Sequence, residues 1–409
     1  MIRLNARTQF FLLLHLLFNQ TFMKFTTVSI LTLTTFLVFN SILIAQPKYT
    51  GQQNAIMTAV PFLMIAPDAR GGALGDAGVA TTPDANSMHW NPAKLAFIQK
   101  DMGISISYSP WLHKLVQDIN LAYLAGFKRI DKNQSVGASL RYFNLGDITF
   151  TDENGYSIGN YRPNEFALDA AYSRLLTRNL SMAVSARFIH SNLTQGQYSQ
   201  GQATKPGNSV AADIAVYQQI PVQFENTEGV FAWGANISNL GAKISYSDAN
   251  LRKDFLPTNL RFGPSLTLDI DEYNSMAFML DINKLLVPTQ PFFQGNSDTI
   301  IAGFNPNVSP VVGLIHSFYD APGGFEEEMR EFSFAGGLEY WYDKQFAIRG
   351  GFFYEDKNKG NRKFATLGAG LRYNVFGLDF SYLIPIQQDN PLANTLRFSL
   401  ILNFDNAGN

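Results

Sequence analysis

From Met102 to Phe404 the chain alternates apolar and polar residues in short segments, which is the pattern of β-strands whose two faces meet different surroundings. In the first segment Met102, Ile104 and Ile106 alternate with serines and a glycine. Fourteen such segments follow one another. They cover residues 102–108, 119–127, 135–143, 165–174, 180–190, 209–217, 230–238, 258–270, 275–284, 331–342, 345–354, 364–373, 376–384 and 395–404.

The connections between these segments alternate in length. Those after even-numbered segments are short, with residues 218–229 as the weak case, whereas those after odd-numbered segments reach the length of residues 285–330. Outer-membrane barrels have short periplasmic turns and longer outer loops. The pattern therefore predicts an all-β fold, a 14-stranded antiparallel transmembrane β-barrel over residues 101–404, with both termini on the periplasmic side.

The last segment supports closure of the barrel. Leu396, Phe398 and Leu400 share one face, and Arg397 and Ser399 lie on the other. Every backbone polar group must be paired in lipid, so the last strand is expected to pair with the first. Residues 405–409 remain as a C-terminal tail.

Residues 68–97 have no regular period. They are rich in glycine and alanine and contain the turn Trp90-Asn91-Pro92-Ala93 just before the first strand. We interpret residues 46–100 as an N-terminal segment and hatch that folds inside the barrel. The alternative is a glycine-rich surface loop that precedes a soluble β domain.

Composition agrees with a barrel. The 409 residues are 46% hydrophobic and 13% aromatic but only 16% charged, against roughly 25% in soluble domains. The mature part lacks the apolar run of about 20 residues that a membrane helix needs. The absence of cysteine excludes disulfides and thiolate chemistry, and the net charge of −2 indicates no nucleic-acid partner.

Residues 1–45 are set apart from the fold. Met23 and Lys24 begin a basic start followed by an apolar stretch that ends at Ala45, the pattern of a secretory signal peptide. Residues 1–22 are interpreted as an upstream extension. A retained membrane anchor is the alternative.

Charged residues within the strands share the face opposite the bulky apolar residues. We expect this face to line the lumen and to form ion pairs with the hatch, because an arginine on the lipid face would cost about 2–4 kcal/mol. A substrate path is the alternative. The inward acids of the strands also include Asp269, Asp281, Glu339 and Asp379. The predicted hatch and lumen network comprises Asp68, Arg70, Asp76, Asn91, Pro92, Arg141, Asp169, Arg187, Asp213, Arg261, Arg349, Arg372 and Arg397.

We find no catalytic set, no metal site and no cofactor motif, so no enzyme is predicted. His89, His113, His190 and His316 are dispersed, and none has metal-ligand spacing. The glutamates at 326–328 are interpreted as a solvated loop run. No Gly-rich phosphate loop is recognised, because no strand-to-helix context surrounds the hatch glycines.

The long connections carry exposed apolar candidates. Long apolar outer loops either cover the barrel mouth as a lid or form a docking surface for another protein. The sequence leaves both possibilities open. The candidates for cargo or partner binding are Trp111, Leu112, Phe292, Phe293 and Phe304.

Several motifs resemble one family of outer-membrane proteins. The irregular segment with its Asn-Pro-Ala turn is similar to the hatch of FadL-like barrels. The match narrows with Thr58–Leu63, Ile65–Arg70, His89–Lys94, Ser109–Leu112 and Asp118–Tyr123. Together they resemble the PorV family, FadL-like components of the type IX secretion system of Bacteroidetes.

This resemblance implies a non-enzymatic role in protein transport at the cell outer membrane. The implied partners are the type IX translocon barrel, cargo proteins with C-terminal sorting domains, the sortase-like attachment subunit and outer-membrane lipid. The connections after strands 1, 3, 5 and 9 are the hypothesised cargo surface. The alternative function is a transporter of hydrophobic small molecules, and an envelope-lipid-modifying enzyme is a third reading.

Overall fold

The structure is a computed structural model. It describes residues 53–112, 116–151, 154–193, 198–199, 202–224, 227–247, 253–295, 297–386, 392 and 395–405. The predicted upstream extension and signal peptide (1–45), His113 and the tail residues 406–409 lie outside this range. Within it, no helix combines the length and the apolar character needed to cross a membrane.

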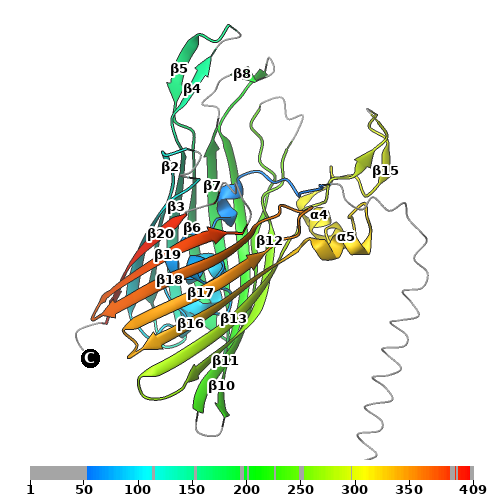
Figure 1. Cartoon of the computed structure of the whole chain (residues 1–409). Helices are drawn as coiled ribbons and strands as arrows, with labels where there is room; N and C mark the ends of the chain where they lie inside the picture. The colour runs from blue at the N-terminus through cyan, green and yellow to red at the C-terminus, as the bar shows by residue number, and fades with distance from the viewer. Residues whose placement is uncertain are drawn as a thin grey trace, which may run out of the picture. The chain divides into compact units, whose positions relative to one another are not determined.

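Fourteen antiparallel strands close into one barrel, so the predicted fold class is confirmed (Figure 1). Each barrel strand pairs with the next barrel strand along the chain, and the last pairs with the first. The strands are β1 (Met102–Pro110), β2 (Ile119–Arg129), β3 (Gln134–Leu145), β6 (Asn164–Leu175), β7 (Leu180–Asn192), β10 (Gly207–Phe224), β11 (Thr227–Gly241), β12 (Asn259–Asp269), β13 (Asn274–Leu285), β16 (Phe332–Tyr342), β17 (Phe346–Tyr354), β18 (Lys363–Tyr373), β19 (Phe376–Pro385) and β20 (Leu396–Phe404).

The closing pair joins β1 to β20 in antiparallel register, from Met102 opposite Phe404 to Tyr108 opposite Phe398. The weak case among the short connections has a structural explanation. β10 and β11 run on past their predicted ends and pair as far as Phe224 opposite Thr227. Ile220, Val222 and Phe224 continue the alternation through this stretch, so the turn is short like the others at this end.

The two faces of the barrel wall differ in chemistry. Large apolar side chains such as Ile106, Leu168 and Ile348 point outward and are exposed. Serines, alanines and charged residues alternate with them and are buried inside. This is the alternation of a transmembrane barrel, with apolar side chains towards lipid and polar side chains towards the lumen.

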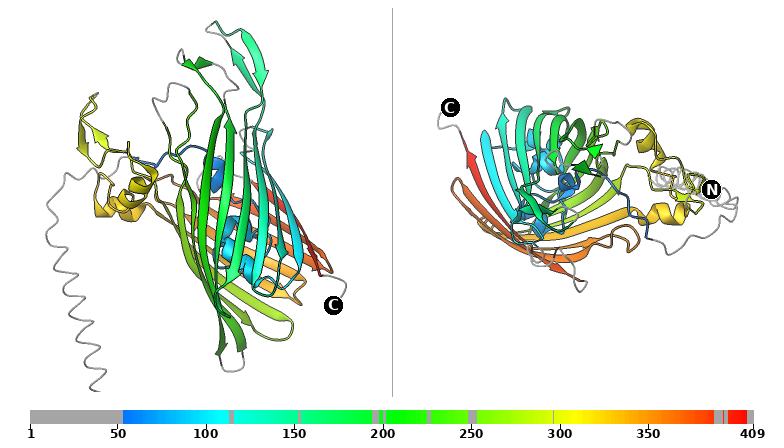
Figure 2. Two further views of the ribbon diagram at one scale, coloured as in Figure 1. Left: turned by 180° about the vertical axis from the view of Figure 1, so that it is seen from behind. Right: turned by 90° about the horizontal axis from the view of Figure 1, so that it is seen from above.

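The long connections contain short elements at one end of the barrel. β4 (Ile148–Thr151) pairs with β5 (Ser157–Tyr161), β8 (Tyr198–Ser199) with β9 (Gln202–Ala203), and β14 (Phe292–Phe293) with β15 (Ile300–Ala302). α4 (Pro310–His316) and α5 (Phe325–Arg330) belong to the connection between β13 and β16. The view from above places α4 and α5 outside the ring of strands (Figure 2).

The hatch fills the lumen with four short helical turns: η2 (Pro61–Met64), α2 (Ala69–Ala73), α3 (Ser87–Trp90) and η3 (Pro92–Phe97). Its apolar residues pack against many strands around the barrel. Leu74 packs with Ala277, Ala335 and Phe364, for example, and Met88 packs with Tyr123. The hatch therefore shares its core with the wall.

Candidate functional site

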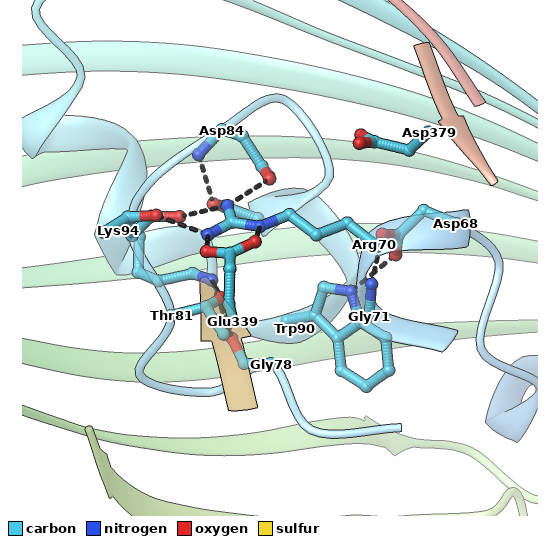
Figure 3. A network of polar contacts seen from close by, with 12 residues as sticks. Asp68, Arg70, Gly71, Gly78, Thr81, Asp84, Trp90, Lys94, Glu339 and Asp379 are labelled. Carbon is cyan, nitrogen blue, oxygen red and sulfur yellow. Dashed lines mark hydrogen bonds and ion pairs between the residues drawn. The ribbon is translucent and has the colours of Figure 1, made fainter. Parts of the chain in front are cut away.

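The start of the hatch is held by Asp68, which caps α2. One carboxylate oxygen accepts a hydrogen bond from the Gly71 backbone N–H at 2.8 Å, and the other accepts one from the Trp90 indole N–H at 2.7 Å (Figure 3). Asp68 thus caps the N-terminus of α2 and also holds Trp90 at the end of α3. Because these partners are 3 and 22 residues away, the Asp-Ala-Arg and Trp-Asn-Pro motifs form one unit.

The Asn91-Pro92 turn closes the hatch. The Asn91 side chain accepts from the Ala93 backbone N–H at 3.0 Å and donates to the carbonyl oxygens of Val79 (3.0 Å) and Val216 (2.9 Å). Pro92 occupies the start of η3, where its missing N–H costs nothing. Asn91 therefore ties the hatch both to itself and to β10.

Lys94 is buried just after this turn. Its ammonium donates to the Gly78 carbonyl at 2.7 Å and to the Thr81 hydroxyl at 2.9 Å, so its charge rests on hatch oxygens rather than on a carboxylate (Figure 3). Asp281 of β13 accepts from the backbone N–H groups of Gly78 and Val79 at 2.8 and 2.9 Å. The Gly78 turn is thus held from both sides.

An unbroken chain of five charged residues joins the hatch to the wall. Arg70 lies 2.6 Å from Glu339, Glu339 lies 2.6 Å from Arg349, and Arg349 lies 2.7 Å from Asp379, which in turn lies 2.6 Å from Arg372. Arg349 and Glu339 are both 1% exposed. Their mutual contacts offset the large cost of placing charge away from water.

A second ion-pair group lies on the other side of the lumen. Arg187 contacts Asp169 at 2.5 Å and Asp213 at 3.1 Å, and it also donates to Asn239. Arg141 differs because its hydrogen-bond partners are the carbonyl oxygens of Phe62 and Leu63 and the His89 ring. Arg141 therefore anchors the η2 turn of the hatch through the carbonyl oxygens of that turn.

The remaining predicted network residues make looser contacts. As ion pairs these are long, since Arg397 lies 3.7 Å from Asp76 and Arg261 lies 3.9 Å from Asp281. Arg261 is held instead by a hydrogen bond to the Asn283 side-chain oxygen at 2.7 Å and by the Trp90 ring, which lies 4.5 Å from its guanidinium. Asp269 shares the strand phase of the buried Arg261 and Ser265 but is exposed, because it is the last residue of β12 and lies beside a short turn.

The loop between β13 and β16 is held by a further charged cluster, separate from the two lumen groups, that the sequence did not predict. Lys284 contacts Glu328 at 3.1 Å and Glu331 at 2.6 Å, and Lys359 contacts Glu327 at 2.6 Å and Glu331 at 3.0 Å. The interpretation of residues 326–328 as a solvated run is therefore wrong for Glu327 and Glu328, which are buried. Only Glu326 pairs at the surface, with Arg330.

The apolar loop candidates fall into two places. Trp111 and Leu112 are half-buried where β1 ends, and the Trp111 ring packs beside Val60 and Phe62 with Arg397 above it. Phe293 and Phe304 are exposed in the loop between β13 and β16, and Phe292 is half-buried there.

That loop also presents apolar residues that the sequence did not single out. Val311 and Ile315 are exposed one turn apart on α4, and Phe325 and Met329 are exposed one turn apart on α5. The i, i+4 spacing was the available signal, but helices this short have no clear period. We call these four exposed residues the loop face.

Among the described residues, no group of three or more histidine, aspartate or glutamate side chains is arranged to hold a metal ion. Most of the buried carboxylates instead face arginine, lysine or backbone N–H groups, and Glu165 accepts from the Ser191 hydroxyl at 2.6 Å. The arrangement binds the hatch to the wall and the loop to the barrel rim.

Comparison with known proteins identifies the family. Residues 48–292 match the family model described as type IX secretion system protein PorV. No curated protein matches the chain. The chain is similar to the solved toluene transporter TbuX of Ralstonia pickettii (12% identity, 83% of this chain and 98% of that one, TM-score 0.44). It is also similar to the toluene transporter TodX of Pseudomonas putida (12%, 86% and 99%, 0.45) and to a FadL homologue of Pseudomonas aeruginosa (11%, 86% and 99%, 0.40). Since the family model covers more than half of the chain, this protein belongs to the PorV family and is an outer-membrane component of the type IX secretion system.

Proposed function

We propose that this protein is a non-enzymatic component that binds exported proteins and transfers them. It binds cargo that carries a C-terminal sorting domain at the translocon barrel and passes the cargo to the sortase-like attachment subunit. The end of the barrel with the long connections faces the cell exterior, and the short turns face the periplasm. The hatch of residues 46–100 and the barrel of residues 101–404 form the functional unit.

The observation that carries this proposal is the folded loop between β13 and β16. Its helices lie outside the ring of strands, and its loop face exposes Val311 (70%) and Phe325 (68%) to solvent. Several exposed large apolar residues within one folded loop favour a site of protein interaction. Of the two roles left open by the sequence, the position beside the barrel favours a docking surface over a lid.

The contents of the lumen disfavour the alternative function. A transporter of hydrophobic molecules needs an apolar passage, whereas this lumen holds the hatch and the buried chain from Arg70 to Arg372. Opening a passage would separate these ion pairs, and breaking a buried pair costs about 3–5 kcal/mol. Uptake of a hydrophobic solute by liposomes that contain the purified protein would support the transporter instead.

Deletion of residues 288–309 tests the proposal in cells. We expect the barrel to assemble, as judged by its heat-dependent mobility in gels, while delivery of cargo to the cell surface falls. Unimpaired delivery with normal barrel assembly would rule residues 288–309, including Phe292, Phe293 and Phe304, out as part of the docking surface.

A further inference from the structure

The residues just before the hatch form an extended strap at the end of the barrel with the long connections. We call residues 53–60 the N-terminal strap. Its side chains alternate, with Asn54 and Val60 buried and Ala55 and Met57 exposed. Such alternation is that of an extended chain lying on a surface with one side free.

Three backbone or side-chain contacts fix where the strap lies. The Asn54 backbone N–H donates to the Asn358 carbonyl at 2.9 Å, and its side-chain amide donates to the Gln290 carbonyl at 3.1 Å. The Ala59 backbone N–H donates to the Phe255 carbonyl at 3.0 Å. All three acceptors belong to long connections, between β17 and β18, β13 and β16, and β11 and β12.

The other end of the hatch lies at the opposite rim. The Asp101 backbone N–H donates to the Phe404 carbonyl at 3.2 Å, and the Asp101 carbonyl accepts from the Arg129 N–H at 2.7 Å. The chain from residue 60 to residue 101 therefore runs the length of the lumen. The expectation that both termini share the periplasmic side does not extend to the strap, although the residues before 53 lie outside the described range.

The strap is also joined to the charged cluster of the loop between β13 and β16, which we call the docking loop. The Asn54 side-chain amide donates to Glu327 at 3.0 Å, and the same Glu327 oxygen lies 2.6 Å from the Lys359 ammonium. Lys359 continues to Glu331, which receives Lys284 and the Thr289 hydroxyl. Asn54 is 8% exposed, so water does not replace these bonds readily.

The strap further forms one wall of a surface groove. The groove has a volume of about 890 Å³ and lies between Met57–Pro61, the connection that contains Phe255, and the docking loop at Pro288 and Phe293. A change in the strap would therefore alter both the Asn54 contacts that hold the docking loop and the side of that loop that lines the groove.

We infer that the N-terminal strap is displayed at the cell surface and acts as a latch that holds the loop between β13 and β16 in its docking position. This inference rests on the orientation given under the proposed function. The N-terminal segment that fills the lumen thus also sets the position of the loop between β13 and β16. The strap couples the filling of the lumen to the completion of the docking surface.

Surface display is tested by single-cysteine labelling, which is clean because the chain has no cysteine. Ala55→Cys is treated with a membrane-impermeant maleimide on intact cells. Asp298→Cys, exposed in the docking loop, reports the orientation of the barrel, and Glu272→Cys, exposed in a short turn, reports the opposite side. We expect Ala55→Cys and Asp298→Cys to react on intact cells and Glu272→Cys to react only after permeabilisation.

The outcomes separate the two hypotheses. Reaction of Asp298→Cys without reaction of Ala55→Cys would overturn the surface strap and leave the orientation intact. Reaction of Glu272→Cys alone on intact cells would overturn the orientation itself and, with it, the proposed docking surface.

The latch is tested by the rate at which a protease cuts the docking loop in the purified protein. Asn54→Ala removes the amide that bonds Glu327 and Gln290, whereas Gln53→Ala changes an exposed neighbour as the control. A hydrogen bond to a charged group is strong enough to change an opening equilibrium about tenfold. We expect cleavage in the loop to be about tenfold faster for Asn54→Ala, with Gln53→Ala like the wild type. Equal rates for all three proteins would overturn the latch.

Discussion

At the scale of single residues, the buried arginines distinguish this lumen from a water-filled pore. Arg349 of β17 is 1% exposed and contacts one carboxylate on the adjacent strand β16 and one on β19, two strands away, as well as the face of Trp341 at 5.2 Å. Its removal leaves Glu339 with Arg70 and Asp379 with Arg372. Each carboxylate then keeps a single cationic partner inside the barrel.

Arg349→Met is expected to lower the free energy of unfolding by about 1.5–3 kcal/mol, because it removes charge-assisted hydrogen bonds to two buried carboxylates that each keep one other cationic partner. Arg330→Met, which breaks the surface pair with Glu326, is the matched control and should cost about 0.3–0.5 kcal/mol. Urea titration of the refolded protein in detergent measures both. Equal midpoints for the two variants would contradict a lumen network that stabilises the fold.

Asp320 in the docking loop predicts a dependence on pH. Burial, together with the charges of Glu328 and Glu331, raises the pKa of Asp320 to about 7 from its usual 3.8. Between these two pKa values the folded loop holds a proton that the unfolded chain has lost. The stability of the loop therefore falls as the pH rises from about 4 to about 7 and levels off above that range.

Asp320→Asn removes this ionisation while keeping an oxygen that can accept from the Thr289 N–H at 3.2 Å. We expect the variant loop to resist protease better than the wild type at pH 8 and to do so by a smaller margin at pH 5. The cleavage rates of both proteins at the two pH values provide the check. A variant that is equally weakened at both would show that the carboxylate is needed in its charged form.

At the scale of elements, two adjacent glycines of β17 separate the two faces of the wall. A Cβ added at Gly351 would lie 2.1 Å from the backbone nitrogen of Gly75 in the hatch, whereas one at Gly350 meets nothing closer than 3.9 Å. Gly75 itself has a φ of +70°, so the hatch turn cannot easily move away by changing its conformation.

Gly351→Ala is therefore expected to displace the hatch turn, and Gly350→Ala to leave it in place. The second variant should be neutral or stabilising by up to about 1 kcal/mol, because glycine is costly within a strand. Protease access to residues 70–80 of the folded barrel reports the displacement. Hatch protection in Gly351→Ala equal to that in Gly350→Ala would mean that the close contact of Gly75 and Gly351 is not required.

The same scale shows what the sequence could predict. The fourteen strands follow from a period of two, because each strand separates lipid from lumen over its whole length. The ends of β10 and β11 were missed, since Pro221 and the surrounding glutamines resemble a turn while the pairing continues past them. A period fixes the face of a residue better than it fixes the end of an element.

Partners were harder to predict than faces. Which lumen acid pairs with which arginine depends on the stagger between strands and on where the hatch lies, and neither is encoded locally. Arg70 illustrates this, since Glu339 lies 269 positions away. The burial of Glu327 and Glu328 was missed for the same reason, because Lys284 and Lys359 come from other parts of the chain.

At the scale of the whole molecule, three layers of polar contacts lie in series. The hatch holds itself through Asp68, Asn91 and Lys94, ion pairs join it to the strands, and the strap joins it to the docking loop. In this arrangement the buried ion pairs and hydrogen bonds lie inside the barrel, and the exposed apolar surface lies outside it. Such a molecule suits the proposed handling of folded cargo beside a barrel better than the passage of a solute through it.

The most direct test is the affinity of a cargo C-terminal sorting domain for the purified protein in lipid nanodiscs. The comparison is with Val311→Asp/Ile315→Asp, which places two charges on the loop face. The control is Lys357→Asp, an exposed residue of the separate β17–β18 connection, which changes the net charge by the same two units. The account predicts binding by the wild type and the control, and a Kd at least about tenfold higher for the loop-face variant. Unchanged affinity in that variant, or no binding by the wild type while protein-containing liposomes take up a hydrophobic solute, would contradict it.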